Sequence, residues 1–263
     1  MTLFELDSVA FRFNRIVAID GLSMSIPAGV RVALLGANGS GKSTLLRILD
    51  GLYLPESGRV RFLGEELSAA RLADEEFARR FRRRVGLLFQ NPDVQLFNPT
   101  VFDEVAFGPL QLGLPAAEVR ERVLGTLDRL RLTDLTDRVP HRLSGGEKKK
   151  VALASVLVME PDVLLLDEPT DALDPRSQSQ LIDLLMDWAD RSKSVITATH
   201  HLGILEEIAD RCFVLDKGRL VADRAPADLL HDQDLLDRTN LIHVHRHRHA
   251  GAQVHTHPHT HGL

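Results

Sequence analysis

The sequence predicts an α/β fold in which helices cover both faces of a parallel β-sheet. Segments with strand character alternate with segments of helical periodicity along most of the chain. Two short runs, at 85–89 and 163–166, contain no polar residue, which is typical of central strands that are buried on both faces. A third apolar run, at 32–35, leads through a glycine-rich loop into a segment with helical character.

That glycine-rich loop has the residue pattern of a phosphate-binding loop. The glycines let successive N–H groups point at one anion, and the following helix N-terminus adds a favourable dipole. Lys42 can reach the β- and γ-phosphates of a nucleotide, and the Ser43 hydroxyl can bind Mg²⁺. A turn that binds nothing is the alternative, but the strand–loop–helix context favours a nucleoside triphosphate. The loop consists of Gly36, Ala37, Asn38, Gly39, Ser40, Gly41, Lys42, Ser43 and Thr44.

Composition limits the other classes of function. The chain has 263 residues, of which 44% are hydrophobic, enough for one large α/β domain or two small ones. Its net charge of −5 gives no general basicity for nucleic acid. The single cysteine, Cys212, fits a reducing cytosol and is expected to be a buried, inert thiol. With no signal peptide and no spanning run, we expect only peripheral contact with the cytoplasmic face of a membrane, through partners.

The N-terminal region predicts an antiparallel β subdomain. Residues 3–26 alternate apolar and polar in two runs that break near Asn14, and a turn at 27–29 follows. Phe13 stands immediately before the break. An exposed ring there would stack on an adenine base, and the alternative is a strand residue packed in the sheet.

The middle of the chain predicts a helical insert. A helix at 74–81 ends in a basic run at 79–84, interpreted either as a solvated helix end or as a contact with anionic lipid or an acidic partner. Residues 101–138 are predicted to be mostly helical, with interruptions at Gly108-Pro109 and at 113–115. Further on, Ser144 with Glu147 forms a capping-box pattern that opens the next helix.

An acidic pair, Asp167-Glu168, ends the apolar run at 163–166. A phosphate loop needs such a partner, because Asp167 would help to hold Mg²⁺ and Glu168 could polarise an attacking water. A buried structural acid is the alternative for Glu168. A strand at 194–199 then ends in His200-His201.

These motifs, in this order, resemble the ATP-binding-cassette (ABC) ATPases over residues 3–235. The resemblance adds the loop glutamine Gln90, the signature at 143–147, the D-loop at 171–174 and the switch histidine His200. It implies a P-loop NTPase fold with a mixed central sheet, an N-terminal antiparallel subdomain and a helical insert at about 92–155. The ABC domain would cover 1–242, and the histidine-rich tail, 243–263, would be disordered without a ligand.

In that family two cassettes enclose ATP between them, so the resemblance implies a dimer with itself or with a paralogous cassette. Integral membrane subunits would dock on the helical insert. The implied catalytic residues are Glu168, His200, Gln90 and Lys42, and Mg²⁺ would be held by Ser43, Gln90 and Asp167. The residues implied to bind ATP are Phe13, Gly36, Asn38, Gly39, Ser40, Gly41, Lys42, Ser43, Thr44, Ser144, Gly145, Gly146 and Asp174.

The stretch from Phe89 to Phe97 resembles the energy-coupling-factor importers, which carry cobalt, nickel or vitamins. The tail favours the metal branch, because imidazole suits Ni²⁺ and Co²⁺. Its histidines are His243, His245, His247, His249, His255, His257, His259 and His261. An expression tag and a functionless tail are alternatives for this segment.

Three other functions stay open at this stage: a vitamin importer with the same ATPase, a soluble ABC ATPase acting on DNA or ribosomes, and a metallochaperone with a secondary phosphate loop. Two positions depart from the family pattern. His201 replaces the usual aspartate and would either cap the next helix or add pH dependence. The three lysines at 148–150 replace Gln and Arg, which puts contacts that need a planar guanidinium in doubt.

Overall fold

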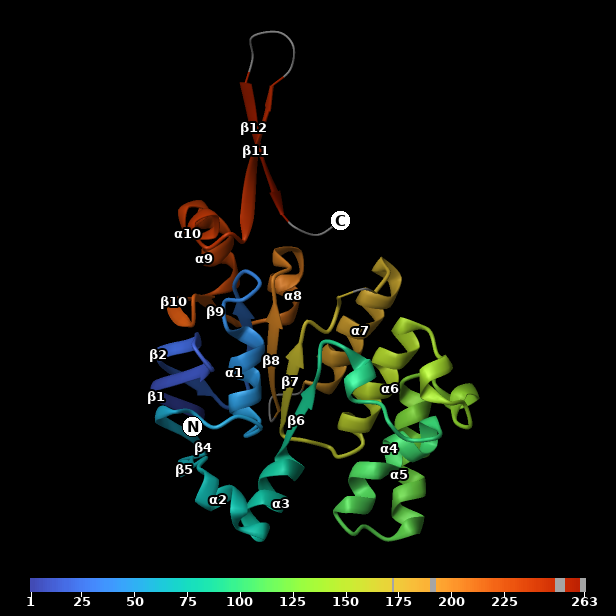
Figure 1. Ribbon diagram of the computed structural model, residues 1–263. Coiled ribbons are helices and arrows are strands. Elements are labelled where there is room, and N and C mark those ends of the chain that lie inside the picture. The colour runs from blue at the N-terminus through green and yellow to red at the C-terminus, as the bar shows by residue number, and fades with distance from the viewer. Residues whose placement is uncertain (172, 190–192, 249–253, 261–263) are drawn as a thin grey trace. The chain divides into compact units, whose positions relative to one another are not determined.

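The computed structural model describes residues 1–171, 173–189, 193–248 and 254–260 (Figure 1). The chain forms two compact units: unit 1 comprises Met1–Leu67 and Ile196–Leu263, and unit 2 comprises Ser68–Val195. Among the helices described, none combines the length and the apolar character that crossing a membrane requires.

Unit 1 contains the antiparallel sheet predicted from residues 3–26. Its strand order is β2-β1-β4-β5, and neighbouring strands run antiparallel. Alternation places Phe4 and Phe62 on the buried face, where their ring centroids lie 5.1 Å apart. The strands are β1 (Thr2–Phe13), β2 (Ile16–Pro27), β4 (Ser57–Phe62) and β5 (Glu65–Glu66).

A second sheet in unit 1 carries the phosphate loop. The strands that unit 1 contributes to it have the order β10-β9-β3-β8, with β3 parallel to β9 and β9 antiparallel to β10, so the sheet is mixed as predicted. Arg31, at the start of β3, donates from Nη2 to the Asp210 carboxylate at 2.5 Å, which ties the beginnings of β3 and β9 together. The elements are β3 (Arg31–Leu35), α1 (Lys42–Leu49), β8 (Ser194–Thr199), η4 (Leu202–Ile204), α8 (Leu205–Ile208), β9 (Arg211–Asp216), β10 (Arg219–Arg224), α9 (Pro226–His231) and α10 (Gln233–Arg238).

Unit 2 is mainly helical around two parallel strands, β6 and β7. Both strands contribute to one apolar core together with residues of α4, α5, α6 and α7. The elements are α2 (Ala69–Ala73), α3 (Glu75–Arg84), β6 (Val85–Leu88), η1 (Pro92–Val94), α4 (Val101–Gln111), α5 (Ala116–Arg129), η2 (Thr133–Leu135), η3 (Pro140–Arg142), α6 (Gly145–Leu157), β7 (Val163–Asp167) and α7 (Pro175–Trp188).

The predicted interruption at Gly108-Pro109 is wrong, because α4 continues through both residues to Gln111. Pro109 lies in the last turn, where a missing N–H removes a single backbone bond near the helix end. Packing explains the glycine: a Cβ at Gly108 would lie 2.7 Å from the Met159 sulfur. Gly108 therefore allows α4 to approach the chain that follows α6.

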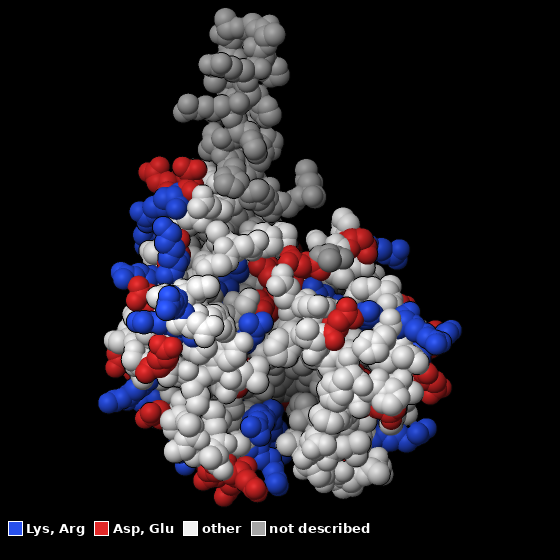
Figure 2. All heavy atoms as spheres, viewed as in Figure 1, with Lys and Arg blue, Asp and Glu red and all other residues white. Residues whose placement is uncertain are grey.

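The basic run at 79–84 lies within α3, which extends beyond the predicted helix to Arg84. Asp74 caps the helix by accepting from the Phe77 N–H at 3.0 Å. Acidic residues occupy its first turn and arginines its last, as the helix dipole favours. Figure 2 shows basic side chains gathered over α3.

The histidine-rich tail contains two short strands, β11 (Ile242–Arg248) and β12 (Val254–Thr260), which pair with each other. His249 and His261 lie outside the described residues. The predicted boundaries at 92–155 and 243–263, and the proposed disorder of the unliganded tail, stay predictions.

Candidate functional site

The phosphate loop in unit 1 is shaped by glycines that no other residue could replace without strain. Gly36, Gly39 and Gly41 have φ values of 149°, 83° and 108°. A Cβ at Gly36 would lie 2.3 Å from the Leu215 carbonyl oxygen, and one at Gly41 would lie 2.6 Å from the Ala18 oxygen. The loop is also fixed to the β9–β10 turn, since the Gly218 N–H donates to the Ser40 carbonyl at 2.9 Å.

The centre of this loop is suited to an anion. Lys42 is buried, and its Nζ donates to the Gly36 carbonyl at 2.7 Å, which holds a positive charge inside the loop. Helix α1 begins there with no acidic residue in its first turn and no side-chain cap. The buried Ser40 Oγ has no hydrogen-bond partner among the described residues. A buried cation, an uncapped helix N-terminus and an orphaned hydroxyl together fit a polyphosphate.

Phe13 belongs to an aromatic cluster at the end of β1. Its side chain is 40% exposed, and its ring meets Phe11 edge-on at 5.0 Å and Tyr53 at 5.6 Å. Phe11 and Tyr53 stack in parallel at 5.0 Å. Phe13 is therefore both a strand residue and partly open to solvent, as adenine stacking requires. The i,i+2 spacing to Phe11 was a visible signal, but nothing in the sequence pointed to Tyr53.

His200 and His201 follow β8, also in unit 1, with ring centroids 4.2 Å apart. His201 is the residue before η4, but its side chain makes no capping bond, so the helix-cap interpretation is wrong. Its backbone N–H donates instead to Thr199 Oγ1 at 3.1 Å.

In unit 2 the loop after β6 is held by side chains that the sequence analysis did not select. Gln95 accepts from the Phe89 N–H at 3.3 Å and donates to the Ala152 carbonyl of α6 at 3.0 Å. The buried Glu104 accepts from two successive loop N–H groups, each at 2.8 Å. Gln90 itself donates to the Asp171 carboxylate at 3.1 Å. The loop glutamine thus contacts the D-loop, of which Ala172 lies outside the described residues.

A buried lysine of α6, the helix that begins at the signature residues, forms hydrogen bonds at the acidic end of β7. Asp167 and Glu168 are buried, and Glu168 has a φ of 47°, in the left-handed region that L-residues rarely adopt. Lys149 of α6 donates from Nζ to the Glu168 carbonyl at 2.9 Å and to the Asp171 carbonyl at 3.0 Å. Burial lowers the pKa of Lys149, while Asp171, Glu168 and Asp167 oppose that shift.

The signature residues form the N-terminus of α6. Ser144 and Glu147 make the predicted capping box, with the Ser144 N–H donating to the Glu147 carboxylate at 2.8 Å. Hydrogen bonds from Ser144 lower the pKa of Glu147, which keeps the cap ionised. Ser144 and Gly145 are exposed, and a Cβ at Gly145 would meet no atom within 4 Å. The end of this helix is therefore open.

The predicted residues fall into two groups. Unit 1 holds Phe13, the phosphate loop and His200, and unit 2 holds Gln90, residues 144–146, Asp167, Glu168 and Asp174. Asp174 caps α7 by accepting from the Arg176 and Ser177 N–H groups, both at 3.1 Å. Cys212 is buried as expected, and burial raises the pKa of its thiol to about 12.

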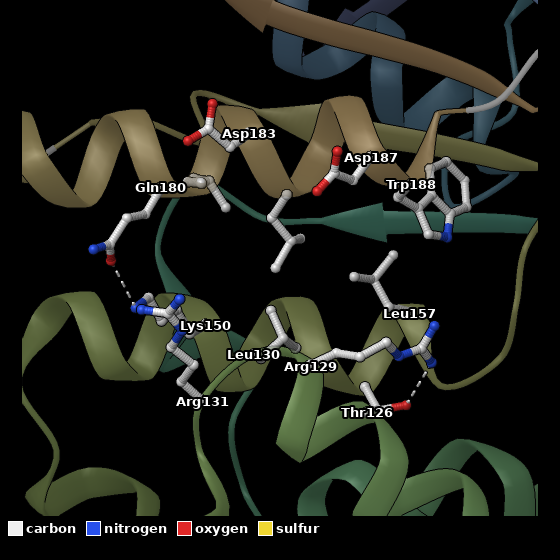
Figure 3. A pocket seen from close by; sticks show the side chains of 12 residues that line it. Thr126, Arg129, Leu130, Arg131, Lys150, Leu157, Gln180, Asp183, Asp187 and Trp188 are labelled. Atoms are coloured by element: carbon white, nitrogen blue, oxygen red, sulfur yellow. Dashed lines mark hydrogen bonds between the residues drawn. The ribbon is translucent and has the colours of Figure 1, made fainter.

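Unit 2 also has a cavity of about 440 Å³ between α5, α6 and α7 (Figure 3). Arg129 and Lys150 lie on one side of it, and Asp183 and Asp187 project from α7 on the other. Leu157 and Trp188 give it an apolar wall. The residues predicted to bind nucleotide are not among those that line this cavity.

These features define a class of protein: an α/β nucleotide-binding protein with a phosphate loop, an acidic strand end and an open signature helix. A family model described as ABC transporter matches residues 19–171, more than half of the chain. The chain therefore belongs to the ABC transporter family, as an ATPase.

Two relatives indicate where in the family the chain lies. The nickel import ATP-binding protein NikO of Rhodobacter capsulatus is 50% identical over 242 residues, covering 91% of this chain and 95% of that protein. The energy-coupling factor transporter ATP-binding protein EcfA of Methanothermobacter thermautotrophicus is 42% identical over 224 residues, covering 85% of this chain and 71% of that protein. The predicted resemblance to energy-coupling-factor ATPases is confirmed.

Solved structures confirm the predicted fold. CbiO1 of Clostridium perfringens, part of the ABC transporter complex CbiONQ, aligns with a TM-score of 0.76 at 35% identity, covering 91% of this chain and 95% of that one. The cassette MJ0796, solved as a dimer in a post-hydrolysis state with ADP and Pi, has a TM-score of 0.76 at 26% identity, covering 85% of this chain and 99% of that one.

Proposed function

We propose that this chain is the ATP-hydrolysing subunit of an importer for nickel or cobalt, working as a nucleotide-sandwich dimer at the cytoplasmic face of the membrane. The observation that supports a dimer is the open N-terminus of α6. Ser144 and Gly145 are exposed there, and a Cβ at Gly145 would meet no atom within 4 Å. Such a helix end attracts an anion, so it can complete the phosphate site of a second cassette. That cassette would be another copy or a paralogue.

On this proposal each group of residues has one task. The loop N–H groups and Lys42 bind the β- and γ-phosphates, and the exposed ring of Phe13 supports adenine. Glu168 accepts a proton from the attacking water, and His200 bonds the γ-phosphate. Ser43, Gln90 and Asp167 offer the oxygen ligands that Mg²⁺ prefers. The metal would neutralise phosphate charge during hydrolysis.

A surface of unit 2 supports docking of a membrane subunit. Its exposed apolar residues include Val94, Phe97, Phe107 and Leu110, with Phe97 at 62%. Phe97 and Phe107 contact each other edge-to-face at 5.0 Å. Exposed apolar clusters of this kind mark interaction sites.

A second surface of unit 2 adds charge. A hollow of about 510 Å³ is lined by three arginines of α3, by two glutamates from the first turn of the same helix, and by two leucines: Arg79, Arg80, Arg83, Glu75, Glu76, Leu112 and Leu114. Figure 2 shows the basic group over α3. We propose that a partner segment with apolar and acidic residues docks on these two surfaces.

The cargo proposal rests on the 50% identity to a protein named as a nickel importer subunit. Uptake of radioactive Ni²⁺ or Co²⁺ tests it in cells that express this chain with its neighbouring membrane genes. We expect uptake that disappears with the Lys42→Ala variant. Uptake of a labelled vitamin without any metal uptake would contradict the metal cargo and favour the vitamin importer.

A further inference from the structure

The cavity between α5, α6 and α7 carries opposite charges on its two sides (Figure 3). Arg129 and Arg131, at and just beyond the end of α5, and Lys150 of α6 form one side, which we name the cationic wall. Asp183 and Asp187 of α7 form the other side, which we name the acidic wall. Both walls belong to unit 2, and neither contains a residue predicted to bind nucleotide.

The two walls do not neutralise each other. None of their five charged side chains forms an ion pair with another residue that the structure describes. Lys150 donates to the side-chain oxygen of Gln180 at 3.5 Å, and Arg129 donates within its own helix. Elsewhere on α5, by contrast, Arg122 pairs with Glu118 at 2.8 Å. Each wall therefore keeps a charge of one sign that no described residue compensates.

Two features of the walls are unfavourable for the free protein. Asp183 and Asp187 stand four residues apart on α7, and like charges at that spacing destabilise a helix. Arg131 has a φ of 57° at the end of α5, a position where glycine is usual because it avoids strain. Its N–H donates to the Asp128 carbonyl at 2.9 Å, which closes the helix end. Strained residues of this kind cluster at ligand sites.

The cavity also has the size and the lining of a small-molecule site. Its volume of about 440 Å³ falls in the range of roughly 300–1,000 Å³ that is usual for ligand pockets. The apolar part of the lining includes Leu130, Leu157 and Leu181, all buried, and the half-buried Trp188. Ligand pockets combine such a lining with a small number of polar groups that fix the orientation of the ligand.

The charges select the class of ligand. A polyanion such as a nucleotide would be repelled by the acidic wall, and a metal cation would be repelled by the cationic wall. An entirely apolar ligand would desolvate charged groups without pairing them, which is costly. A molecule with an anionic group at one end, an ammonium at the other and an apolar body between them satisfies both walls and the lining.

We propose that this cavity binds a small zwitterion with an apolar or aromatic body, with its carboxylate on the cationic wall and its ammonium on the acidic wall. The site is separate from the residues proposed to bind nucleotide, and its role goes beyond the proposed transport function. Because the ligand would contact α6 and α7 at once, it would hold these two helices together.

Three probes of similar shape and different charge test the proposal. They are 4-(aminomethyl)benzoate, which is a zwitterion, benzoate, which lacks the ammonium, and benzylamine, which lacks the carboxylate. Calorimetric titration of the full chain without nucleotide measures each affinity. We expect the zwitterion to bind about tenfold more tightly than either of the other probes. Equal affinities for the three probes would overturn the proposal, and this comparison needs no variant.

Two variants test which wall holds which group. In the acidic-wall variant, Asp183→Asn/Asp187→Asn, we expect the affinity for the zwitterion to fall to that for benzoate. In the cationic-wall variant, Arg129→Gln/Arg131→Gln/Lys150→Gln, we expect it to fall to that for benzylamine. Wild-type affinity for the zwitterion in both variants would show that the walls do not bind it and would overturn the proposal.

The matched control is Arg120→Gln/Glu121→Gln, which changes two exposed charges of α5 that do not line the cavity. We expect this variant to bind the zwitterion as the wild type does, and circular dichroism verifies the fold of every variant. Since binding is measured without nucleotide or membrane subunits, its failure would leave the proposed transport function standing. Loss of metal uptake in the earlier experiment would leave the cavity proposal standing.

Discussion

Unit 1 and unit 2 hold their functional residues by different means. In unit 1 the backbone makes the site: three glycines with positive φ curve the phosphate loop around the buried ammonium of Lys42. In unit 2 side chains make it: Lys149 and Gln90 cross between elements to hold Glu168 and Asp171. A backbone cradle is rigid, whereas side-chain bonds between elements can exchange partners.

This difference separates binding from turnover. Substitutions in the loop should remove nucleotide affinity, because Lys42 supplies the buried positive charge of the loop. Substitutions in unit 2 should leave affinity intact and lower the rate, because they act on groups positioned for the reaction. Three variants test this contrast.

The largest effect is expected from Glu168→Gln. The change removes the proton acceptor but keeps the side-chain volume and the backbone carbonyl that Lys149 binds. We expect kcat to fall about 10³-fold, with unchanged ATP affinity and an ATP-bound dimer that persists. Steady-state ATPase assays and light scattering at saturating ATP measure both. A monomer under those conditions would count against the sandwich mechanism.

Lys42→Ala should act on binding instead. It removes the only positive charge buried within the described loop, so we expect nucleotide affinity to fall about 100-fold, in line with the loss of a charge-assisted contact. Fluorescent-nucleotide titration measures this. Arg238→Ala, at an exposed cation of α10 in the same unit, is the matched control and should bind normally. Unchanged affinity in Lys42→Ala would show that the loop is not the nucleotide site.

Lys149→Met should give the smallest effect, and it tests most directly whether contacts in unit 2 affect turnover without affecting nucleotide binding. Methionine fills a similar volume but cannot donate to the Glu168 and Asp171 carbonyls, so the acidic strand end loses its anchor. We expect kcat to fall about tenfold while KM for ATP stays within about twofold.

Lys148→Met is the control for this experiment, since Lys148 pairs with the exposed Asp93 at 2.8 Å. Equal kinetics in the two variants would mean that Lys149 has no positioning role. A rise in KM without a change in kcat would place its effect on binding.

Local features of the structure were predictable from the sequence. The phosphate loop and the capping box at Ser144 depend on residues a few positions apart, so their patterns are visible in the chain itself. The contact of Lys149 with Glu168 joins residues 19 apart, and that of Gln90 with Asp171 joins residues 81 apart. Such contacts follow from tertiary packing, and the lysine run at 148–150 gave no sign of which member is buried.

Packing also explains the misjudged helix break. Gly108 and Pro109 weaken a helix in isolation, but α4 is held by the apolar core of unit 2, and tertiary contacts outweigh that local cost. For Phe13 the sequence left two interpretations open, an exposed ring that stacks on adenine or a strand residue packed in the sheet. In the structure the ring packs against Phe11 and Tyr53 and is also 40% exposed.

The cavity in unit 2 has a spectroscopic consequence. Trp188, the only tryptophan in the sequence, lines it at the last residue of α7, and the Lys193 ammonium lies 4.5 Å from the indole centroid. Helix α7 is 14 residues long and starts at the Asp174 cap, so its two ends are about 21 Å apart. Intrinsic emission from this single fluorophore can therefore follow the far end of α7 in real time during each catalytic cycle, without any dye.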